Sequence, residues 1–507
     1  MNASQPSPTT LVDLFAASPA DKVALVAPEK DLRVTYGQLR EQVTACAEAL
    51  AAAGVKRGDR IGTALPNGIP NVVTFLAASM VGTAAPLNPN YKEEEFAFYL
   101  EDTNATFLLL PPDGADAARK AACTRFPILC VDMDDAGNVR LAPDGGRTPV
   151  APPSVDEVAL ILHTSGSTGR PKRVPLSHAN LSISARNIVS TYDLGPDDVS
   201  LCVMPLFHVH GLVASSLATL ASGGTVVVPG KFNPLSFWRV ARDYNVTWYS
   251  AVPTLHQLLV ARADPAAGKP AGAEKLRFIR SCSASLAPQL MSDLEAAFGA
   301  PVLEAYGMTE AAHQMASNPL PPSSRKPGSV GPNTGTTTIG IMDAAGNLLK
   351  QGERGEVVIK GANVVTGYEN NPEANASSFA NGWFRTGDQG YLDPEGYLNL
   401  TGRLKEMINR GGEKISPREV DEVLLAHPAV AEAVAFGVPH PMWGEEVAAC
   451  VVLSGDASES DLLAFCKEKL ADFKRPQQIH ITTAIPRTAT GKIQRRIVAE
   501  AFAGQAK

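Results

Sequence analysis

The segment that most constrains this chain is a loop rich in hydroxyl groups and glycine that follows a buried strand. Residues 158–162 (VALIL) are apolar and predict a strand, and residues 163–173 (HTSGSTGRPKR) follow them directly. Glycines let backbone N–H groups approach an anion, hydroxyls donate hydrogen bonds to its oxygens, and Lys172 adds positive charge. The loop is not a Walker A motif, because Pro171 precedes the lysine and Arg173 stands where a Ser or Thr would bind Mg²⁺. It therefore predicts a phosphate-binding loop of another kind; the alternative is a polar loop with a surface lysine.

Strand-like runs alternate with Ala/Leu-rich helical patterns along most of the chain. Examples of such runs are residues 225–229, 246–250 and 276–280. This alternation predicts α/β layers, and 507 residues with 45% hydrophobic content are enough for about three domain-sized units. Residues 61–91 carry no charge, but four prolines interrupt them, so they predict a buried helix and strand rather than a membrane span.

The character of the chain changes near residue 402. A turn-rich segment and a strand at residues 397–400 precede this point, and the remaining part, about 100 residues, has the size of a small α+β domain. Ser416 predicts an N-cap, Pro417 the first helical position, and Glu419 completes a capping box. We place two domains at residues 1–402 and 403–507. The alternative is a surface loop inside one domain, and composition alone does not decide between them.

Charge and cysteine usage disfavour several functional classes. The chain has 45 basic and 52 acidic residues, a net charge of −7, and no basic run long enough to predict nucleic-acid binding. Its seven cysteines form no CxxC or Cys/His cluster, which indicates a reducing compartment and no structural zinc. The N-terminus has no signal-peptide pattern. We expect a cytoplasmic soluble protein, monomeric or homodimeric, that binds acidic ligands through local basic residues.

Three further segments contain residues suited to nucleotide chemistry. The first, residues 304–310 (EAYGMTE), contains an aromatic ring, a hydroxyl and a carboxylate. The second, residues 383–388 (WFRTGD), contains an aspartate after glycine. The third, residues 486–493 (PRTATGKI), contains a lysine after glycine. An aromatic face can stack on a base, and a carboxylate is a suitable ligand for a hard cation. Each segment alone is more often an ordinary helix start, a turn aspartate or a solvated lysine.

Together, and in this order, the segments resemble the motifs of the adenylate-forming superfamily, which includes acyl-CoA synthetases, luciferases and adenylation domains. The motifs span residues 163–496, and the resemblance covers nearly the whole chain. The departure is Arg173, where glycine is usual; we expect it to alter the flexibility of the loop or its reach over the phosphates and to leave the phosphate-facing residues intact. The resemblance implies an α/β fold: a large N-terminal adenylation domain of several subdomains and a small, mobile α+β C-terminal domain.

The resemblance also implies a role for each motif residue. Lys492 would be the catalytic lysine, Thr309 would bind the α-phosphate, and Glu310 would ligate Mg²⁺. Tyr306 would stack on adenine, and Asp388 would accept hydrogen bonds from the ribose hydroxyls.

Further nucleotide and CoA contacts are implied in the same way. The phosphate-loop residues are Thr164, Ser165, Gly166, Ser167, Thr168, Gly169 and Lys172. The residues around the nucleotide are Ser283, Ala284, Ser285, Glu304, Ala305, Gly307 and Met308. Arg403 would reach the ribose or phosphate, and Lys405 would be the hinge of the mobile domain. Gly411 and Gly412 would lie beside the pantetheine arm of CoA, where a Cβ would obstruct it.

The reaction that the resemblance implies joins a carboxylic acid to CoA at the expense of ATP. The carboxylate attacks the α-phosphorus to give an acyl-adenylate and pyrophosphate, and the CoA thiolate then displaces AMP. Three alternatives remain: a nucleotide-binding protein that has lost catalysis, a luciferase-like oxygenase, and an adenylation domain that serves a carrier protein. The presence of Lys492, Glu310 and Asp388 disfavours the first, and the lack of a following carrier module disfavours the third.

Four stretches outside the shared motifs resemble the oxalate–CoA ligases of plants and fungi. They are residues 206–211, 247–253, 280–285 and 312–315. An activated diacid keeps one charged carboxylate, which is costly to bury unpaired. His208, Ser283 and His313 are candidate donors to it, with Arg280 a weaker one. Malonate and a 4-coumarate-like aryl acid are the alternative substrates. The alternative for His208 is a gate near CoA, and for His313 a histidine on a helix surface.

Overall fold

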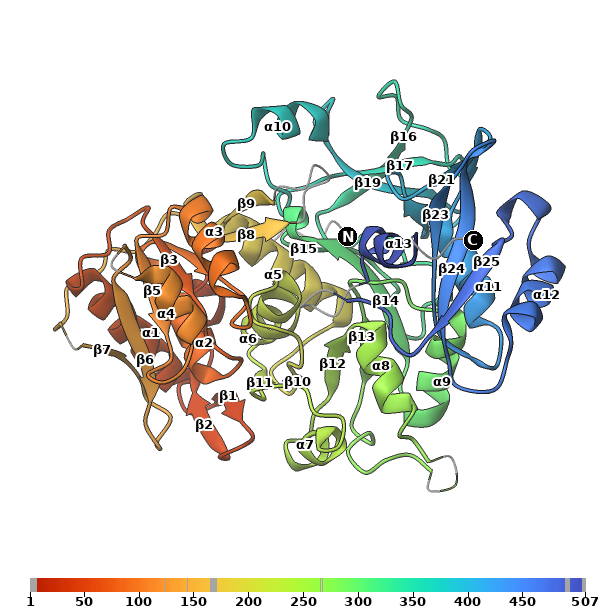
Figure 1. The fold of residues 1–507 in the computed structure, drawn as a ribbon. Coiled ribbons are helices and arrows are strands. Elements are labelled where there is room, and N and C mark those ends of the chain that lie inside the picture. The colour runs from red at the N-terminus through yellow and green to blue at the C-terminus, as the bar shows by residue number, and fades with distance from the viewer. Residues whose placement is uncertain are drawn as a thin grey trace.

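The computed structural model describes residues 7–123, 125–143, 145–164, 171–264, 266, 268–487 and 493–503. Within these ranges the strands form four sheets. Two of them lie in α/β layers, a third lies beside these, and the fourth belongs to a small C-terminal body (Figure 1). This architecture confirms the predicted fold class.

A seven-stranded sheet contains the strand before the phosphate loop. Its strand order is β7 (Val139–Ala142), β6 (Ile128–Met133), β5 (Phe107–Leu110), β3 (Arg60–Thr63), β4 (Thr83–Pro86), β8 (Val158–Thr164) and β9 (Lys172–Ser177). The pairs from β6 to β8 are parallel, whereas β9 runs antiparallel to β8 with Thr164 opposite Lys172. The predicted strand at residues 158–162 therefore corresponds to β8, which pairs antiparallel with β9.

An eight-stranded sheet supplies the other wall of the large part of the molecule. Its order is β15 (His313–Ser317), β14 (Val302–Met308), β13 (Phe278–Ser281), β12 (Trp248–Ala251), β10 (Val199–Leu201), β11 (Thr225–Val227), β1 (Val23–Ala27) and β2 (Leu32–Thr35). The pairs from β14 to β1 are parallel, and β15 returns antiparallel to β14. The predicted strands at residues 225–229, 246–250 and 276–280 correspond to β11, β12 and β13.

Helices fill the space between these sheets and cover their outer faces. The inner helices are α1 (Tyr36–Ala52), α2 (Ile69–Val81), α5 (His178–Tyr192) and α6 (Ala218–Ala221), and they share one core with both sheets. The outer helices are α3 (Glu93–Thr103) and α4 (Asp116–Ala122) on the first sheet, and α7 (Phe237–Asp243), α8 (Pro253–Val260) and α9 (Pro288–Phe298) on the second. In α1, Leu39, Val43 and Leu50 are buried at helical spacing, which orients this helix toward the core.

A third sheet lies beside the ends of the first two. Its strands are β16 (Thr338–Met342), β17 (Gly355–Lys360), β18 (Phe379–Ala380), β19 (Trp383–Leu392) and β20 (Leu398–Arg403), with α10 (Pro372–Ser378) before β18. Short helical turns occur at η1 (Asp13–Phe15), η2 (His210–Leu217, a π-helix), η3 (Thr309–Ala311) and η4 (Asp472–Lys474).

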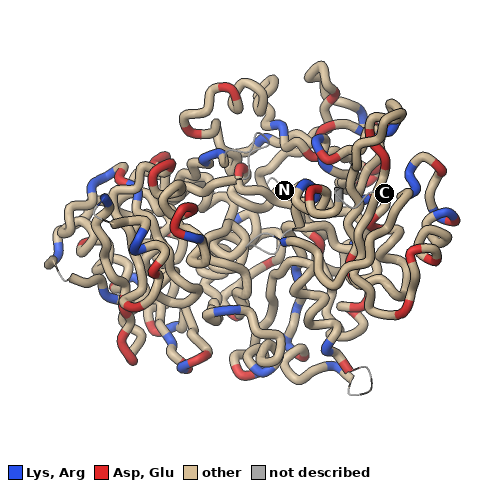
Figure 2. The backbone as a smooth tube through the Cα atoms, viewed as in Figure 1, with Lys and Arg blue, Asp and Glu red and all other residues tan. Residues whose placement is uncertain are grey.

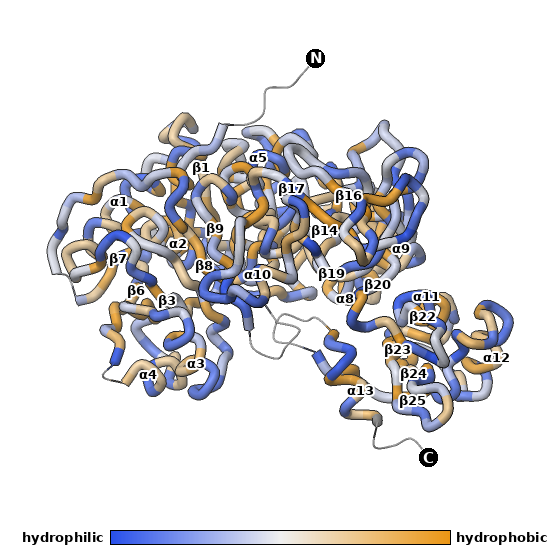
Figure 3. Tube along the Cα trace, turned by 90° about the horizontal axis from the view of Figure 1, so that it is seen from above, coloured by the Kyte–Doolittle hydropathy of each residue, from blue (hydrophilic) through white to orange (hydrophobic). Residues whose placement is uncertain are grey.

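The C-terminal body has a sheet and a core of its own. It contains β21 (Ile408–Arg410), β22 (Glu413–Ile415), β23 (Val430–His440), β24 (Gly444–Leu453), β25 (Gln478–Thr482), α11 (Pro417–Leu425), α12 (Glu459–Lys469) and α13 (Arg495–Ala503). Figure 3 shows these elements set beside the rest of the chain. A boundary between residues 402 and 403, at the end of β20, stays our proposal.

Helix α11 begins where the sequence predicts, but the predicted capping box is wrong. Ser416 is the N-cap and Pro417 the first helical residue, yet no side-chain cap forms. The Ser416 hydroxyl instead donates to the carbonyl oxygen of Thr401, and the Glu419 carboxylate accepts from Lys474 Nζ at 2.7 Å. Partners from β20 and η4 therefore outcompete the local cap.

Charged residues of both signs are intermixed along the trace (Figure 2), in keeping with a net charge of −7. An anion must therefore be bound by local groups rather than by a field from one whole face. In the described ranges, no helix combines the length and the apolar character that crossing a membrane requires.

Candidate functional site

The predicted site residues meet where strands of three sheets end. Thr164 ends β8, Met308 ends β14, and Arg403 ends β20. The predicted residues Ser165, Gly166, Ser167, Thr168, Gly169 and Lys492 lie outside the described residues. Carboxyl ends of parallel strands are a common place for ligands in α/β sheets.

Glu310 is held by two hydroxyl groups in a way that suits a metal ligand. It lies in η3 and is 5% exposed. Its Oε1 accepts hydrogen bonds from Thr164 Oγ1 at 3.4 Å and from Tyr368 at 2.8 Å. Mg²⁺ is usually held by one or two carboxylates together with phosphates and water. No group of three or more acidic, His or Cys side chains forms a cation cage within the described residues, so a metal here would depend on Glu310 and the nucleotide.

Lys172 lies near Glu310, and both side chains contact Tyr368. Its Nζ lies 4.4 Å from the centre of the Tyr368 ring. Burial lowers the pKa of Lys172, and the nearby Lys405 lowers it further, while Glu310 opposes both effects. Two ammonium groups close enough to repel form a place where an anion is favourable. The arrangement therefore suits a phosphate chain.

Tyr306, Asp388 and Arg403 form a second group of contacting side chains. The Tyr306 hydroxyl donates a short hydrogen bond to Asp388 Oδ2, and Arg403 Nε lies 2.9 Å from Asp388 Oδ1. The negative charge of Asp388 raises the pKa of Arg403, and burial raises that of Tyr306. A carboxylate offers about four acceptor positions, so Asp388 keeps capacity for ribose hydroxyls.

The two candidate acid-binding residues Ser283 and His313 meet through a third residue that the sequence interpretation missed. His210 Nδ1 lies 3.0 Å from Ser283 Oγ, and the His210 and His313 rings are 5.3 Å apart. His210 begins η2, and π-helical segments are rare and frequent at functional sites. His208, two residues earlier, is half-buried with its ring 6.2 Å from that of Phe207. The signal for His210 was the same HVHG stretch, in which we selected the other histidine.

Both Ser283 and His313 have backbone conformations that L-residues rarely adopt. Their φ angles are 71° and 117°. Non-glycine residues in such regions persist only where surrounding structure enforces them, and they cluster at functional sites. His313 begins β15 and is 2% exposed, so the alternative of a helix-surface histidine is wrong.

Arg280 lies behind this pair, fully buried on β13. Its Nε donates to Tyr192 at 2.8 Å and its Nη1 to Ser250 Oγ at 3.0 Å. Its Nη2 donates to Gln314 Oε1 at 3.0 Å and approaches His313 Nδ1 at 3.4 Å. No carboxylate pairs with it among the described residues. The cluster therefore places a buried positive charge among neutral polar side chains that are far apart in sequence.

The remaining predicted nucleotide contacts lie on or next to β14. Ala305 and Glu304 are buried, whereas Ala284 and Ser285 are exposed. A Cβ at Gly307 would lie 2.1 Å from the carbonyl oxygen of His313, so only glycine lets β15 come this close. Thr309 begins η3 directly after Met308.

Lys405 lies between β20 and β21, and Gly411 and Gly412 connect β21 to β22 within the C-terminal body. Lys405 is exposed close to Lys172. Gly411 and Gly412 have φ angles of 58° and 97°. A Cβ on Gly411 would lie 2.9 Å from the Trp443 ring, so packing against Trp443 gives this glycine a structural reason of its own.

Arg173 turns away from the phosphate side. Its Nη1 donates to the carbonyl oxygen of Asp102, and its Nε lies 3.5 Å from Glu369 Oε2. Its side chain is 12% exposed. The position that departs from the superfamily pattern thus ties β9 to α3 and to the segment after β17.

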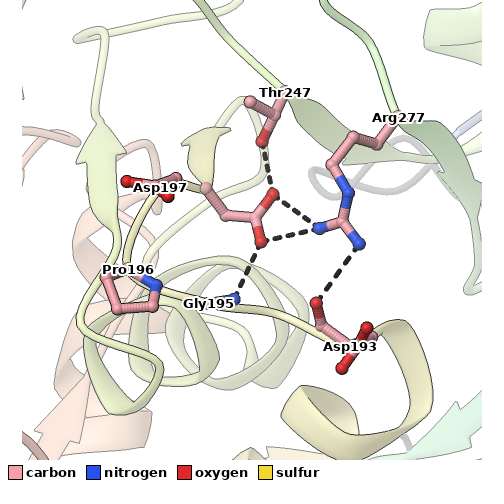
Figure 4. Close-up of a pocket in the computed structure, with 7 residues that line it drawn as sticks. Asp193, Gly195, Pro196, Asp197, Thr247 and Arg277 are labelled. Carbon is pink, nitrogen blue, oxygen red and sulfur yellow. Dashed lines mark hydrogen bonds and ion pairs between the residues drawn. The ribbon is translucent and has the colours of Figure 1, made fainter.

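A surface hollow of about 290 Å³ lies elsewhere, around Arg277 and Asp198 (Figure 4). Arg277 Nη1 donates to both Asp198 oxygens at 2.7 and 2.6 Å, and its Nη2 donates to the carbonyl oxygens of Tyr192 and Asp193. Thr247 and Gly195 donate to the same aspartate. These groups use their hydrogen-bonding capacity on one another. We therefore interpret the residues around the hollow as a structural ion pair rather than as a binding site.

Comparisons with known proteins agree with this geometry. The AMP-binding enzyme family model matches residues 12–369, and the model of the AMP-binding enzyme C-terminal domain matches residues 419–492. The probable CoA ligase CCL9 of Humulus lupulus is 49% identical, over 98% of this chain and 97% of that protein. The oxalate–CoA ligase of Arabidopsis thaliana is 47% identical, over 97% of this chain and 98% of its own.

The structure of ATP-bound MatB from Rhodopseudomonas palustris superposes with a TM-score of 0.90 at 30% identity, covering 99% of this chain and 100% of that one. Both the family models and the full-length similarities therefore extend across the large part and the C-terminal body. The chain belongs to the AMP-binding enzyme family, the adenylate-forming superfamily, and relatives that span its whole length are CoA ligases.

Proposed function

We propose that the protein is an AMP-forming acid–CoA ligase and that its acid is oxalate. It would convert oxalate, ATP and CoA to oxalyl-CoA, AMP and pyrophosphate. The observation that carries the proposal is the buried cluster of Arg280, His210, Ser283 and His313 beside Glu310. Relatives named as CoA ligases support the reaction class, and one named as an oxalate–CoA ligase supports the acid.

The charge of the cluster favours an acid that stays anionic after activation. Oxalate has two carboxylates, of which one becomes the acyl-adenylate and the other keeps its charge. Burying that charge unpaired is costly, and Arg280 is a buried cation whose described partners are all neutral. An aryl or fatty acid would instead leave the guanidinium without an anion.

The position of the cluster favours a short diacid. His313 pairs with Met308 across the β14–β15 hairpin, and Glu310 lies in the turn between them. The carboxylate that attacks the α-phosphorus must lie near Thr309 and Glu310, while the other must reach Ser283 and His313. In oxalate the two carboxylate carbons are bonded directly to each other, which gives the least separation; malonate, with one CH₂ between them, is the next candidate.

The side chains then have distinct tasks in the first half-reaction. Lys172 and Glu310 would hold the phosphates, the latter through Mg²⁺, which neutralises phosphate charge when bound. Asp388, with Tyr306, would fix the ribose, and Lys492 would stabilise charge on the α-phosphate and the attacking carboxylate. None of these residues forms a covalent bond to the substrate, because positioning and charge are sufficient for this transfer.

The second half-reaction needs the C-terminal body in another orientation. Lys405 is exposed in the short connection between β20 and β21, where a change in backbone angles can rotate one body against the other. We propose that it is the hinge, and that Gly411 and Gly412 then approach the pantetheine arm.

The test is an acid panel measured by pyrophosphate release, with AMP and ADP resolved. We expect AMP, and a kcat/KM for oxalate well above that for malonate, acetate, 4-coumarate and medium-chain acids. His313→Ala should raise the KM for oxalate, while the control His427→Ala in the C-terminal body should leave it unchanged. ADP as product would overturn the ligase reaction; a preference for malonate or an aryl acid would overturn only the choice of oxalate.

A further inference from the structure

Arg280 is connected by two branches of polar contacts to the candidate acid-binding residues His313 and Ser283. One branch runs directly to His313 through Nη2, and the other runs to Ser283 through Ser250 and His210. The guanidinium is fully buried, and Tyr192 and Gln314 fix its plane from the other side. Four side chains contact the guanidinium and fix its position, so it can orient the side chains that contact it.

A guanidinium donates hydrogen bonds and never accepts them, and it does not lose its proton in proteins. His313 Nδ1, 3.4 Å from Arg280 Nη2, must therefore be the acceptor in this contact. An imidazolium would place N–H against N–H. The ring proton of His313 then lies on Nε2, on the opposite side of the ring from Arg280.

Arg280 also fixes the proton positions along the second branch. Ser250 Oγ accepts from Arg280 at 3.0 Å, and the only acceptor for its own hydrogen among the described contacts is His210 Nε2, at 2.6 Å. His210 then carries its proton on Nδ1 and donates it to Ser283 Oγ at 3.0 Å. The hydroxyl hydrogen of Ser283 is thereby directed away from His210.

We propose that Arg280 is a positioning residue that sets the proton positions of His313 and Ser283, so that both present hydrogen-bond donors to the unreacted carboxylate of the acid. The inference rests on the proposed function and extends it to a residue that need not touch the substrate. Two donors and a buried positive charge then form a site for one carboxylate, with both histidines neutral.

Among the described contacts of His313, the titratable partners are Arg280 on β13 and His210 on η2. From α5, Ser184 Oγ donates to the carbonyl oxygen of Ala312 at 2.8 Å and adds no charge. A fixed positive charge beside Nδ1 opposes a second proton on the ring. The KM for oxalate should therefore be flat with pH across the range where an exposed histidine titrates, near pH 6.5.

A direct test is the tautomer of His313, read from long-range ¹H–¹⁵N NMR on the full chain labelled at histidine and assigned by loss of the signal in His313→Gln. We expect an unprotonated Nδ1 and a protonated Nε2 from pH 5.5 to 8. A proton on Nδ1, or a ring that titrates near pH 6.5, would overturn the inference. This readout is independent of which acid is turned over.

The kinetic test compares Arg280→Met and Arg280→Lys with Arg277→Met. Arg277 precedes the same strand and forms the structural ion pair with Asp198, so its loss should lower stability without changing the KM for oxalate. Arg280→Met should raise that KM by about tenfold or more, make it vary with pH between 6 and 8, and leave the KM for ATP unchanged. Arg280→Lys should restore part of the affinity.

A purely structural role for Arg280 would lower the melting temperature and kcat of Arg280→Met without a new pH dependence, and would overturn the proposal. Failure of the proposed function is recognised separately, since wild-type protein would then reject oxalate in the acid panel before any variant is made.

Discussion

The Tyr368 hydroxyl donates a 2.8 Å hydrogen bond to Glu310 Oε1, while the face of the same ring lies 4.4 Å from Lys172 Nζ. One side chain therefore orients both the candidate metal ligand and the candidate phosphate ligand. Tyr368 lies in the connection between β17 and α10, and its side chain contacts Lys172 on β9 and Glu310 after β14. No pattern in the sequence marked it.

Tyr368→Phe should raise the Mg²⁺ concentration needed for half-maximal activity more than it raises the KM for the acid. The change removes the stronger of the two hydrogen bonds to Glu310 Oε1 and keeps the ring under Lys172. A lost hydrogen bond to a charged group costs about 1.5–3 kcal/mol, so half-saturation by Mg²⁺ should rise about tenfold or more. Pyrophosphate release as a function of Mg²⁺ concentration measures it, with Tyr391→Phe as the control. Equal Mg²⁺ curves for the two variants would contradict the assigned role.

Arg173→Gly, which restores the residue usual in the superfamily, should cost stability and spare nucleotide binding. Arg173 lies between Asp102 and Glu369 and is mostly buried, so its removal takes a cation from both carboxylates, although His163 still pairs with Asp102 and Arg60 with Glu369. The loss of these contacts to charged groups should cost about 1.5–3 kcal/mol. Thermal unfolding and the KM for ATP are the two measurements. Lys172→Met should give the opposite result, with a raised KM for ATP and little change in stability. A raised KM for ATP in Arg173→Gly would show that the arginine reaches the phosphates.

Glu304 predicts a specific dependence of stability on pH. The residue is 1% exposed, its Oε2 has no hydrogen-bond partner among the described residues, and burial raises its pKa to about 7. An unfolded glutamate has a pKa of about 4.3. Between these values the folded chain keeps a proton that the unfolded chain has lost. The contribution of Glu304 to the free energy of unfolding is therefore complete below about pH 4.3 and falls as the pH rises to about 7.

Glu304→Gln cannot ionise and should remove this fall, which amounts to about 4 kcal/mol. The free energy of unfolding at pH 5, 6, 7 and 8 measures it, and exposed Glu94→Gln serves as the control. If Glu304→Gln loses stability with pH as steeply as the wild type, the carboxylate is ionised in the folded state throughout.

Lys492→Ala should stop adenylation and spare the thioester step. A lysine that stabilises the transition state of the first half-reaction is worth about 2–4 kcal/mol, or about 100-fold in rate. Pyrophosphate release from oxalate and ATP tests the first step, and CoA-dependent consumption of supplied oxalyl-adenylate tests the second. Lys469→Ala, on α12, is the matched control. Equal losses in the two steps would remove Lys492 from its proposed role.

The parts of the structure that were predictable from sequence are those that local patterns determine. The apolar run before the phosphate loop became β8, the β-branched runs became β11, β12 and β13, and Pro417 began α11. Alternating strands and helices were sufficient for the α/β class, because each element must bury its apolar face against another layer.

The site was predictable only where one segment contained the whole signal. Thr164 and Glu310 lie in recognisable motifs, but their contact with each other depends on the meeting of two sheets. His210, Ser250 and Tyr368 were missed because their roles come from partners 30 or more residues away. The capping box at Ser416 failed for the same reason, since Thr401 and Lys474 compete for its members.

The left-handed backbone at Ser283 and His313 limits how this chain can change its acid. Residues that tolerate φ angles of 71° and 117° are few, chiefly glycine and asparagine, so β-branched or bulky replacements there would disturb the loops themselves. Directed evolution toward longer acids would therefore succeed first at neighbouring positions with ordinary backbone, such as Ala305 on β14. The inherited turn geometry thus restricts which substrates are within reach of single substitutions.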